Sequence, residues 1–512
     1  MSHYALTIGG KAITTPKTFD VLNPADETVV AACPEGTPAL VDEAVLSARR
    51  ALSSWAALPD SERVSKLLAI ADAIEKHHTE LSELVTREQG KTQSGPGANL
   101  EVGGAAAWTR VTAGLSIVEE TIQDDESGKI VLRRKPVGVV ASITPWNWPL
   151  MIAVWHVMPA IRVGCTVVIK PSPFTPLSTL RLVELMNQIL PPGVINSVTG
   201  GVEVGNHLTN HPGIDKIVFT GSIATGKKVM GSAAQHLKRV TLELGGNDAG
   251  IVLPGTNIEP LLEKLFWGCF INAGQTCAAL KRLYVHQDQY DEIVKKFSEY
   301  VAKIPVGNGL DPKNLIGPVS NKMQLDKVAA YVDDARARGA TIVTGGVRPK
   351  SPGFFYPLTV IADAADDMRV VKEEQFGPVI PIVKYKTVDE AIGRANALDV
   401  GLGGSVWGND PQEAARYASR LECGTAWVNQ HGTLHPMAPF GGVKCSGIGV
   451  EFNIDGLKEY TTVQVVNVAL RNPSRSPAGR AAPTRRAAPT RGEAIDARIS
   501  TWHSGDSRSG AR

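Results

Sequence analysis

One cysteine and one glutamate of this chain could together make and hydrolyse a thioester. Glu243 ends an apolar run in Thr241-Leu-Glu-Leu-Gly-Gly-Asn247, and Cys277 follows in the small-residue stretch Asn272-Ala-Gly-Gln-Thr-Cys-Ala278. A thiolate is a nucleophile, and a carboxylate can activate water as a general base. The pair could therefore form an acyl-enzyme and release it, provided that the fold brings the two residues together.

Four further motifs stand where predicted strands end or begin. Pro145-Trp-Asn-Trp-Pro149 fixes the amide of Asn147 in a rigid turn, where it could donate to an oxyanion. Lys170-Pro-Ser172 offers a cation to a phosphate or ribose, and Phe219-Thr-Gly-Ser222 leads into a helix start that favours an anion such as a pyrophosphate. Glu373-Glu-Gln-Phe-Gly-Pro378 precedes another strand. Taken singly, each motif also fits a structural role: a capping amide, a surface lysine, a plain turn or solvated acids.

Short β-branched runs alternate with helices and predict two α/β units that position these motifs. The first unit has the pattern of a parallel, doubly wound sheet, with a helix expected at 177–190 and strands at 137–143, 166–170, 194–198, 216–219 and 239–243. Ligands bind outside the carboxyl ends of such strands. A second alternating region begins near Asp248, so a domain boundary is expected close to Gly245-Gly246. Before the first sheet, two long helices are expected between about 38 and 90.

The C-terminal part of the chain changes character twice. Residues 461–468 alternate like an edge strand, or like a strand added to another subunit's sheet. The segment 471–512 is rich in Arg, Pro and Ala and repeats Arg-Ala-Ala-Pro-Thr-Arg, so we predict that it is disordered.

Composition indicates a globular protein without a nucleic-acid or membrane role. The 512 residues are too many for one core. Their net charge is +2, to which the segment 471–512 contributes +6 and the remainder −4, so the remainder is mildly acidic. The six cysteines lack CxxC spacing, so neither a metal site nor a disulfide framework is expected. No signal peptide and no apolar run of about 20 residues is evident, which favours a cytoplasmic location.

Taken together, these motifs resemble those of the aldehyde dehydrogenase superfamily over residues from about 20 to 468. The matching motifs are Pro-Trp-Asn-Trp-Pro, Lys-Pro-Ser, Phe-Thr-Gly-Ser, Leu-Glu-Leu-Gly-Gly-Asn, Gly-Gln-Thr-Cys, Glu-Glu-Gln-Phe-Gly-Pro and Pro439-Phe-Gly-Gly-Val-Lys-Cys-Ser-Gly447. The resemblance implies a Rossmann-like cofactor-binding domain, a second α/β catalytic domain and a small β oligomerisation extension. By residue number these would be 1–115 with 137–245, then 246–445, then 116–136 with 459–470, in a homodimer or homotetramer.

The resemblance also implies a mechanism. Cys277 would attack the aldehyde, and the thiohemiacetal oxyanion would be held by the Asn147 amide and the Cys277 backbone N–H. Hydride transfer would leave a thioester, which water activated by Glu243 would hydrolyse to the carboxylic acid. Because the proton that Glu243 takes would come from water, the pair need not hydrogen-bond in the resting state.

The implied cofactor is NAD. Lys170 would contact the adenosine ribose, Glu374 the nicotinamide ribose, and Phe376 the ring. The other implied cofactor residues are Thr144, Pro145, Trp146, Ser172, Gly221, Ser222, Thr225 and Leu244. Pro173 replaces a glutamate that grips the ribose hydroxyls in many members of the family, so NADP stays open.

The implied aldehyde site is lined by Trp148, Trp155, Thr276, Ala278, Leu434 and Phe440. It has no evident arginine, which favours a neutral or apolar aldehyde. Alternatives are a coenzyme A-acylating dehydrogenase, a cofactor-independent thiol esterase built on Cys277 and Glu243, and a non-catalytic protein on the same fold.

Overall fold

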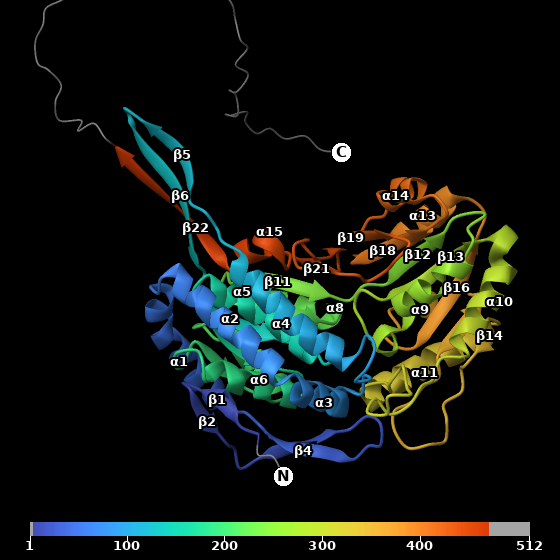
Figure 1. Ribbon diagram of the computed structural model, residues 1–512, viewed down its shortest axis with the longest axis horizontal. Coiled ribbons are helices and arrows are strands. Elements are labelled where there is room, and N and C mark those ends of the chain that lie inside the picture. The colour runs from blue at the N-terminus through green and yellow to red at the C-terminus, as the bar shows by residue number, and fades with distance from the viewer. Residues whose placement is uncertain (1–3, 470–512) are drawn as a thin grey trace, which may run out of the picture.

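The computed structural model describes residues 4–469, which form two α/β bodies side by side and a narrow β extension (Figure 1). The predicted disordered tail, 471–512, lies outside the described residues. Two three-layered bodies agree with the expectation that one core could not serve the whole chain.

The first sheet has six strands in the order β21-β11-β10-β7-β8-β9. Its five parallel strands are those predicted, whereas the short edge strand β21 is antiparallel to β11. The bounds are β7 Val139–Ile143, β8 Thr166–Lys170, β9 Ile195–Ser197, β10 Lys216–Gly221, β11 Arg239–Leu244 and β21 Gly447–Ile448.

Helices cover both faces of this sheet, which confirms the doubly wound prediction. Val140 packs into the core beneath α2, α4, α5 and α6, whereas its neighbours Val139 and Ala141 pack beneath α1, α7 and α8. The helices are α1 Pro38–Ala56, α2 Asp60–Lys76, α3 His78–Gln89, α4 Ala98–Gly114, α5 Pro149–Arg162, α6 Leu177–Asn187, α7 Val202–Asn210 and α8 Ile223–Ala234.

The prediction of two helices between 38 and 90 was wrong, because three form. His77 leaves helical geometry at φ −101° and ψ 19°, which ends α2 and lets α3 start as a separate helix at His78. The periodic apolar residues continue through this break, so the hydrophobic pattern alone did not reveal it.

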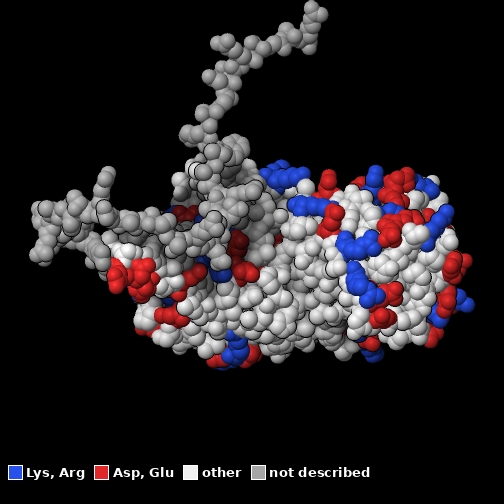
Figure 2. Space-filling view, turned by 90° about the horizontal axis from the view of Figure 1, so that it is seen from above, with Lys and Arg blue, Asp and Glu red and all other residues white. Residues whose placement is uncertain are grey.

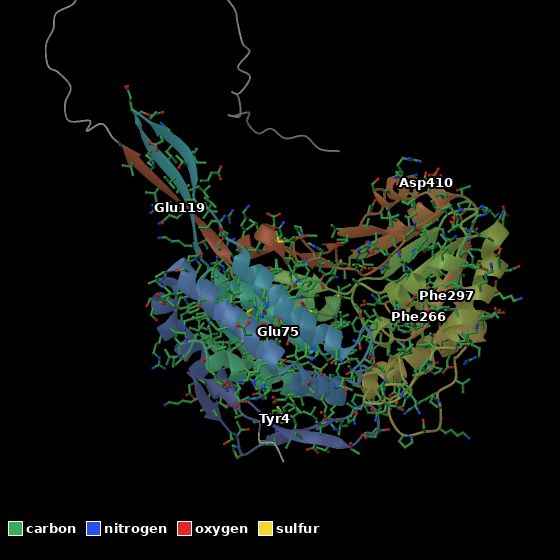
Figure 3. The ribbon with its side chains drawn as sticks, in the orientation of Figure 1. Tyr4, Glu75, Glu119, Phe266, Phe297 and Asp410 are labelled. Carbon is green, nitrogen blue, oxygen red and sulfur yellow. The ribbon has the colours of Figure 1, made fainter. Side chains whose placement is uncertain are left out.

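The second sheet has seven strands in the order β14-β15-β16-β13-β12-β18-β19, with β14 as an antiparallel edge. One of its cores contains Phe266 and Phe297, which are labelled in Figure 3. The strands are β12 Asp248–Val252, β13 Leu280–His286, β14 Thr341–Thr344, β15 Thr359–Ala362, β16 Val379–Tyr385, β18 Gly403–Trp407 and β19 Thr425–Val428. The helices are α9 Leu262–Phe270, α10 Tyr290–Val301, α11 Lys322–Ala337, α12 Arg369–Lys372, α13 Val388–Asn396 and α14 Pro411–Ala418.

The chain crosses from the first sheet to the second at Gly245-Gly246. β11 ends at Leu244 and β12 begins at Asp248, so the carboxyl edge of the first sheet leads directly into the amino edge of the second. The chain then returns to the first sheet through β21, and α15 Asn453–Lys458 packs against α5. Groups from both sheets can therefore converge at this junction.

A three-stranded antiparallel sheet in the order β22-β6-β5 projects from the first body (Figure 1). Its strands are β5 Glu120–Asp125, β6 Gly128–Pro136 and β22 Thr461–Ala469. Glu119, labelled in Figure 3, forms an ion pair with Arg133 of β6. The prediction of an edge strand at 461–468 is confirmed, and its partner inside the chain is β6.

Small elements complete the described chain. They are β1 Leu6–Ile8, β2 Lys11–Ile13, β3 Thr18–Leu22, β4 Val29–Pro34, β17 Val400–Gly401, β20 Val443–Lys444, and the 3-10 turns Glu259–Leu261, Ile271–Gly274 and Gln287–Gln289. On the face seen in Figure 2, acidic and basic side chains are interspersed over the right-hand part of the described surface. Within residues 4–469 no helix is long and apolar enough to cross a membrane.

Candidate functional site

The carboxyl edge of the first sheet gathers the motifs that the sequence singled out. The Asn147 turn follows β7, Lys170 ends β8, Ser222 follows β10, and Glu243 is the penultimate residue of β11. Because these strands are parallel neighbours, their ends lie at one edge, as the doubly wound pattern predicted.

The second sheet contributes from its amino edge, as the position of the Glu373–Pro378 motif before a strand indicated. Cys277 lies three residues before β13, and Glu374 lies in the loop before β16. Asp248, a buried carboxylate at the start of β12, completes this edge. The rule that ligands meet the carboxyl ends of strands therefore located only half of the site.

An unusual backbone run presents Cys277. Asn272, Ala273 and Gly274 all adopt positive φ, at 52°, 55° and 71°. Two consecutive non-glycine residues in this region are strained, and such strain persists where the surroundings fix it. A Cβ on Gly274 would lie 2.1 Å from the carbonyl oxygen of Gly377, so this position also requires glycine for close approach.

That run clamps Asn147 against the Cys277 loop. The side-chain amide nitrogen of Asn147 donates to the Gln275 backbone carbonyl at 3.0 Å. The backbone carbonyl of Asn147 accepts a hydrogen bond from Asn272 Nδ2 at 2.8 Å. Lys91, a buried residue paired with Glu101, donates to the same carbonyl at 2.7 Å. An amide nitrogen carries two N–H bonds, so one remains for a further acceptor.

The Cys277 thiol and the Glu243 carboxyl lie close enough to influence each other's pKa. Burial raises the pKa of Glu243 well above its usual range, the charge of Glu451 raises it further, and a hydrogen bond from the Cys277 thiol opposes both. Glu243 Oε1 has no hydrogen-bond partner among the described residues. The expectation that the pair need not hydrogen-bond in the resting state stays a prediction.

Cys277 is the one nucleophilic side chain in this cluster, and it is partly accessible. Burial raises the pKa of its thiol well above the usual range, and the negative charge of Glu243 adds to this effect. The backbone N–H of Cys277 has no acceptor within the described chain. A free N–H and a clamped amide therefore flank the sulfur, an arrangement that suits an oxyanion.

The predicted cofactor residues lie along the same edge. Lys170 is buried with only the carbonyl of Pro171 as a hydrogen-bond partner, and burial lowers its pKa to about 8. Ser222 caps α8 by accepting from Thr225 N, which leaves the helix start exposed beside Gly221. The buried hydroxyl of Thr144 has no hydrogen-bond partner among the described residues. Ser172, two residues after Lys170, is also buried. An under-bonded cation, an orphaned hydroxyl and an open helix start fit a ribose-phosphate ligand.

A second part of this candidate ribose-phosphate site spans the junction between the two sheets. A Cβ on Gly245 would lie 2.3 Å from Glu374 Oε2, so glycine allows this carboxylate to rest on the crossing strand beside Leu244. The ring of Phe376 packs edge-on against Trp146, which follows Pro145, with centroids 5.4 Å apart. These contacts place Glu374 and Phe376 next to the Asn147 turn.

Comparisons with known proteins decide what kind of site this is. The model of the aldehyde dehydrogenase family matches residues 12–466. This chain belongs to that family. An aldehyde dehydrogenase of Enchytraeus buchholzi is 41% identical over 470 residues, covering 90% of this chain and 93% of the other. Human retinaldehyde dehydrogenase 3 is 38% identical over 470 residues, covering 89% and 91%.

Solved structures agree with the assignment to the aldehyde dehydrogenase family. Staphylococcus aureus betaine aldehyde dehydrogenase in complex with NAD+ superposes with a TM-score of 0.89 at 36% identity, covering 92% of this chain and 95% of the other. The NAD+ complex of a Bacillus cereus aldehyde dehydrogenase gives the same TM-score at 36% identity, covering 92% and 97%. The predicted fold class is confirmed.

Within this member of the aldehyde dehydrogenase family, apolar residues line the other side of Cys277. Leu434, Phe440 and Ala278 share one cluster with the thiol. Trp148 donates from its indole nitrogen to Thr276 Oγ1 at 3.0 Å, and Trp155 packs in the adjoining cluster. The six predicted substrate residues therefore either neighbour Cys277 in its own cluster or loop, or pack in the adjoining cluster.

Sequence reasoning missed two aromatic residues of this wall. Phe452 packs edge-on against Trp155 at 4.8 Å and lies at 6.0 Å from Phe440, and Trp108 of α4 touches both Phe452 and Trp155. Phe452 has φ 69° and ψ 168°, a conformation that non-glycine residues rarely adopt. Phe452 gave no signal in the sequence, because only the return of the C-terminal segment brings it here, and Trp108 lies on α4, far in sequence from the motifs.

Proposed function

We propose that this protein oxidises an aldehyde to a carboxylic acid with NAD+ through an acyl-enzyme on Cys277. The observation that carries the proposal is the single cluster of a partly accessible thiol, the nearby Glu243 carboxyl that shifts the pKa of that thiol, and the clamped amide of Asn147. Membership of the aldehyde dehydrogenase family supports the assignment.

In this proposal Cys277 attacks the aldehyde carbon and forms a C–S bond. The resulting alkoxide accepts hydrogen bonds from the second N–H of the Asn147 side chain and from the free backbone N–H of Cys277. Removing one such donor in other enzymes costs about 10²–10³ in rate. The clamp by Lys91 and Asn272 keeps the amide in place before the substrate arrives.

NAD+, when bound, supplies the hydride acceptor that converts the thiohemiacetal to a thioester. The residues proposed to hold it are Thr144, Pro145, Trp146, Lys170, Ser172, Gly221, Ser222, Thr225, Leu244, Glu374 and Phe376. NAD+ in the two structural relatives supports this binding site. So do the few hydrogen bonds of the Lys170 ammonium group and the unpartnered hydroxyl of Thr144. No carboxylate stands at Pro173 to repel a 2′-phosphate, so we propose a preference for NAD+ without strict rejection of NADP+.

Glu243 then acts as the general base that releases the acid. Its unpartnered Oε1 can accept a proton from water, and the water oxygen attacks the thioester carbon as the C–S bond breaks. The same carboxyl lies near enough to the sulfur to shift the pKa of the thiol, so a water bound to it would start close to the carbon under attack.

The aldehyde is proposed to be neutral or apolar. Its wall consists of Trp148, Trp155, Thr276, Ala278, Leu434 and Phe440, extended by Trp108 and Phe452, and none of these can pair with a substrate carboxylate. Polar atoms on the wall, such as the indole nitrogen of Trp155, have no partner among the described residues and could orient a polar tail.

Three broader proposals follow from the chain as a whole. Residues 1–115 with 137–245 would bind NAD+, 246–445 would carry the nucleophile, and 116–136 with 459–470 would join subunits into a homodimer or homotetramer. β22 has no charged residue and exposed Val463, Val465 and Val468, whereas the opposite edge, β5, is acidic. All six cysteines are free, which favours a cytoplasmic location.

Product analysis with and without coenzyme A tests the proposed function. A panel of neutral aldehydes should give the free acid with one equivalent of reduced NAD, and coenzyme A should not change the product. An acyl-CoA product would establish the acylating alternative. Ester cleavage without any aldehyde oxidation, with either NAD+ or NADP+, would establish the thiol esterase instead.

A further inference from the structure

Lys281 is a buried cation beside the nucleophile that none of the functional motifs includes. It is the second residue of β13, in the interior of the seven-stranded sheet, and its exposed fraction is 2%. A lysine buried in this way costs free energy unless it has partners. Its neighbour Arg282 points to the other face of the sheet, where it donates to the Asn247 and Ala395 carbonyls.

The partners of Lys281 include residues from both halves of the proposed catalytic machinery, besides the Ala279 carbonyl at 3.4 Å. Its Nζ donates to the backbone carbonyl of Cys277 and lies 3.1 Å from Glu374 Oε1. The other oxygen of Glu374 rests against Gly245, so the carboxylate is held from two sides. One ammonium group therefore links the nucleophile's loop to the carboxylate proposed to hold the nicotinamide ribose.

The charges around Cys277 explain why a cation is needed there. Besides burial, the carboxylates of Glu243, Glu374 and Asp248 raise the pKa of the thiol, and Lys281 lowers it. Lys281 also acts on the buried His431, whose pKa is lowered chiefly by burial. The exposed Lys327 is a second lysine near Glu374, but it donates to that residue's backbone carbonyl at 3.0 Å.

We propose that Lys281 is a positioning residue that serves the nucleophile and the coenzyme seat at once. Its charge favours the thiolate of Cys277 amid three carboxylates, and its ion pair orients Glu374 toward the ribose. The second half rests on the proposed function, whereas the first concerns the thiol of the coenzyme-free protein.

The rate of Cys277 alkylation by iodoacetamide as a function of pH tests the first half. Lys281→Met should move the midpoint upward by a unit or more, which slows alkylation below the midpoint by about tenfold. Lys281→Arg should restore the wild-type profile, and Cys277→Ala defines the background. The matched control Lys327→Met removes a lysine at Glu374 without a contact to Cys277, so its profile should match wild type.

A second variant keeps the test decisive if Lys281→Met does not fold. Glu374→Gln removes a carboxylate near the thiol and leaves Lys281 in place, so the alkylation midpoint should move downward. Opposite shifts in the two variants support the proposal. An unchanged midpoint in Lys281→Met, or in Glu374→Gln where only that variant folds, overturns it.

Calorimetric titration with NAD+ tests the second half. Lys281→Met should weaken NAD+ binding by about tenfold, with Lys281→Arg intermediate, and wild-type affinity in the Met variant would overturn the positioning of Glu374. If the wild-type protein bound no NAD+, the proposed function itself would fail. The alkylation profiles would still decide the role of Lys281 at the thiol.

Discussion

At the scale of single residues, the site is a compromise between burial and charge. Burial is the largest cause that raises the pKa of both Cys277 and Glu243. The charge of Glu243 raises the pKa of the thiol further, whereas the thiol lowers the pKa of Glu243 by hydrogen bonding to it. Catalysis would ionise the two groups one after the other, the thiol first and the carboxyl when water enters.

The raised pKa of Glu243 predicts how turnover depends on pH. A carboxyl acts as a base only when deprotonated, so hydrolysis of the thioester should rise as pH increases through the raised value rather than near the usual 4.5. Steady-state turnover between pH 5 and about 9 checks this. In Glu243→Gln the rise in acid release should be absent; a rise of wild-type size in that variant would contradict the assignment.

Pro173 makes a prediction about the coenzyme. A carboxylate introduced by Pro173→Glu would stand near the adenosine ribose and repel a 2′-phosphate, so the ratio of kcat/KM with NAD+ to that with NADP+ should increase by about tenfold, or about 1.4 kcal/mol. Pro173→Ala, which changes the backbone without adding charge, should leave the ratio nearly unchanged. An equal effect of both variants would show that the turn, not the charge, matters.

At the scale of elements, the run of positive φ at Asn272, Ala273 and Gly274 places the nucleophile. It bends the chain after α9 so that the Cys277 loop meets the Asn147 turn. Gly274 is the position of this run that most clearly excludes a side chain, since an added Cβ would collide with the Gly377 carbonyl.

Gly274→Ala should therefore damage both stability and activity. Left-handed strain alone costs about 1–2 kcal/mol, and the collision with Gly377 adds to it, so the free energy of unfolding should fall by at least about 2 kcal/mol. Denaturant unfolding and kcat measure the two effects. Gly231→Ala is the control, because its Cβ meets nothing within 4 Å in the middle of α8 and should stabilise by about 0.5–1 kcal/mol. Equal behaviour of the two variants would contradict this account.

Sequence patterns predicted the regular elements better than their meeting points. The strands of the first sheet follow from β-branched runs, and Thr166–Lys170 forms as predicted. The break at His77 and the αL run before Cys277 escaped prediction, because hydrophobic periodicity does not record backbone dihedrals. Phe452 and Lys281 escaped because their contacts depend on segments distant in sequence, and a lysine in a strand is usually exposed.

At the scale of the whole molecule, the β extension is the part of the described chain whose own hydrophobic core is too small to account for its stability. A three-stranded sheet with one uncharged, valine-bearing edge is a template for pairing with another strand. The charged β5 edge would discourage the same pairing on the other side.

Assembly through β22 predicts the effect of a charge on that edge. Val465→Lys should shift the molar mass measured by light scattering toward the monomer, since Val465 is 58% exposed and its substitution leaves the subunit core intact. Ile122→Lys on β5, where the exposed fraction is 56%, is the matched control and should keep the wild-type mass. A wild-type monomer, or loss of assembly only in the Ile122 variant, would contradict assembly through β22.

The central claim is that Cys277 carries an acyl group that Glu243 helps to release. Glu243→Gln, mixed with NAD+ and a reactive aldehyde and quenched in acid, should accumulate the acyl group, because loss of a general base slows its hydrolysis by about 10²–10⁴. Peptide mass spectrometry should place the added mass on Cys277, and Cys277→Ala should carry none. Reduced NAD formed in at least stoichiometric amount without any acyl group on Cys277 would contradict the account.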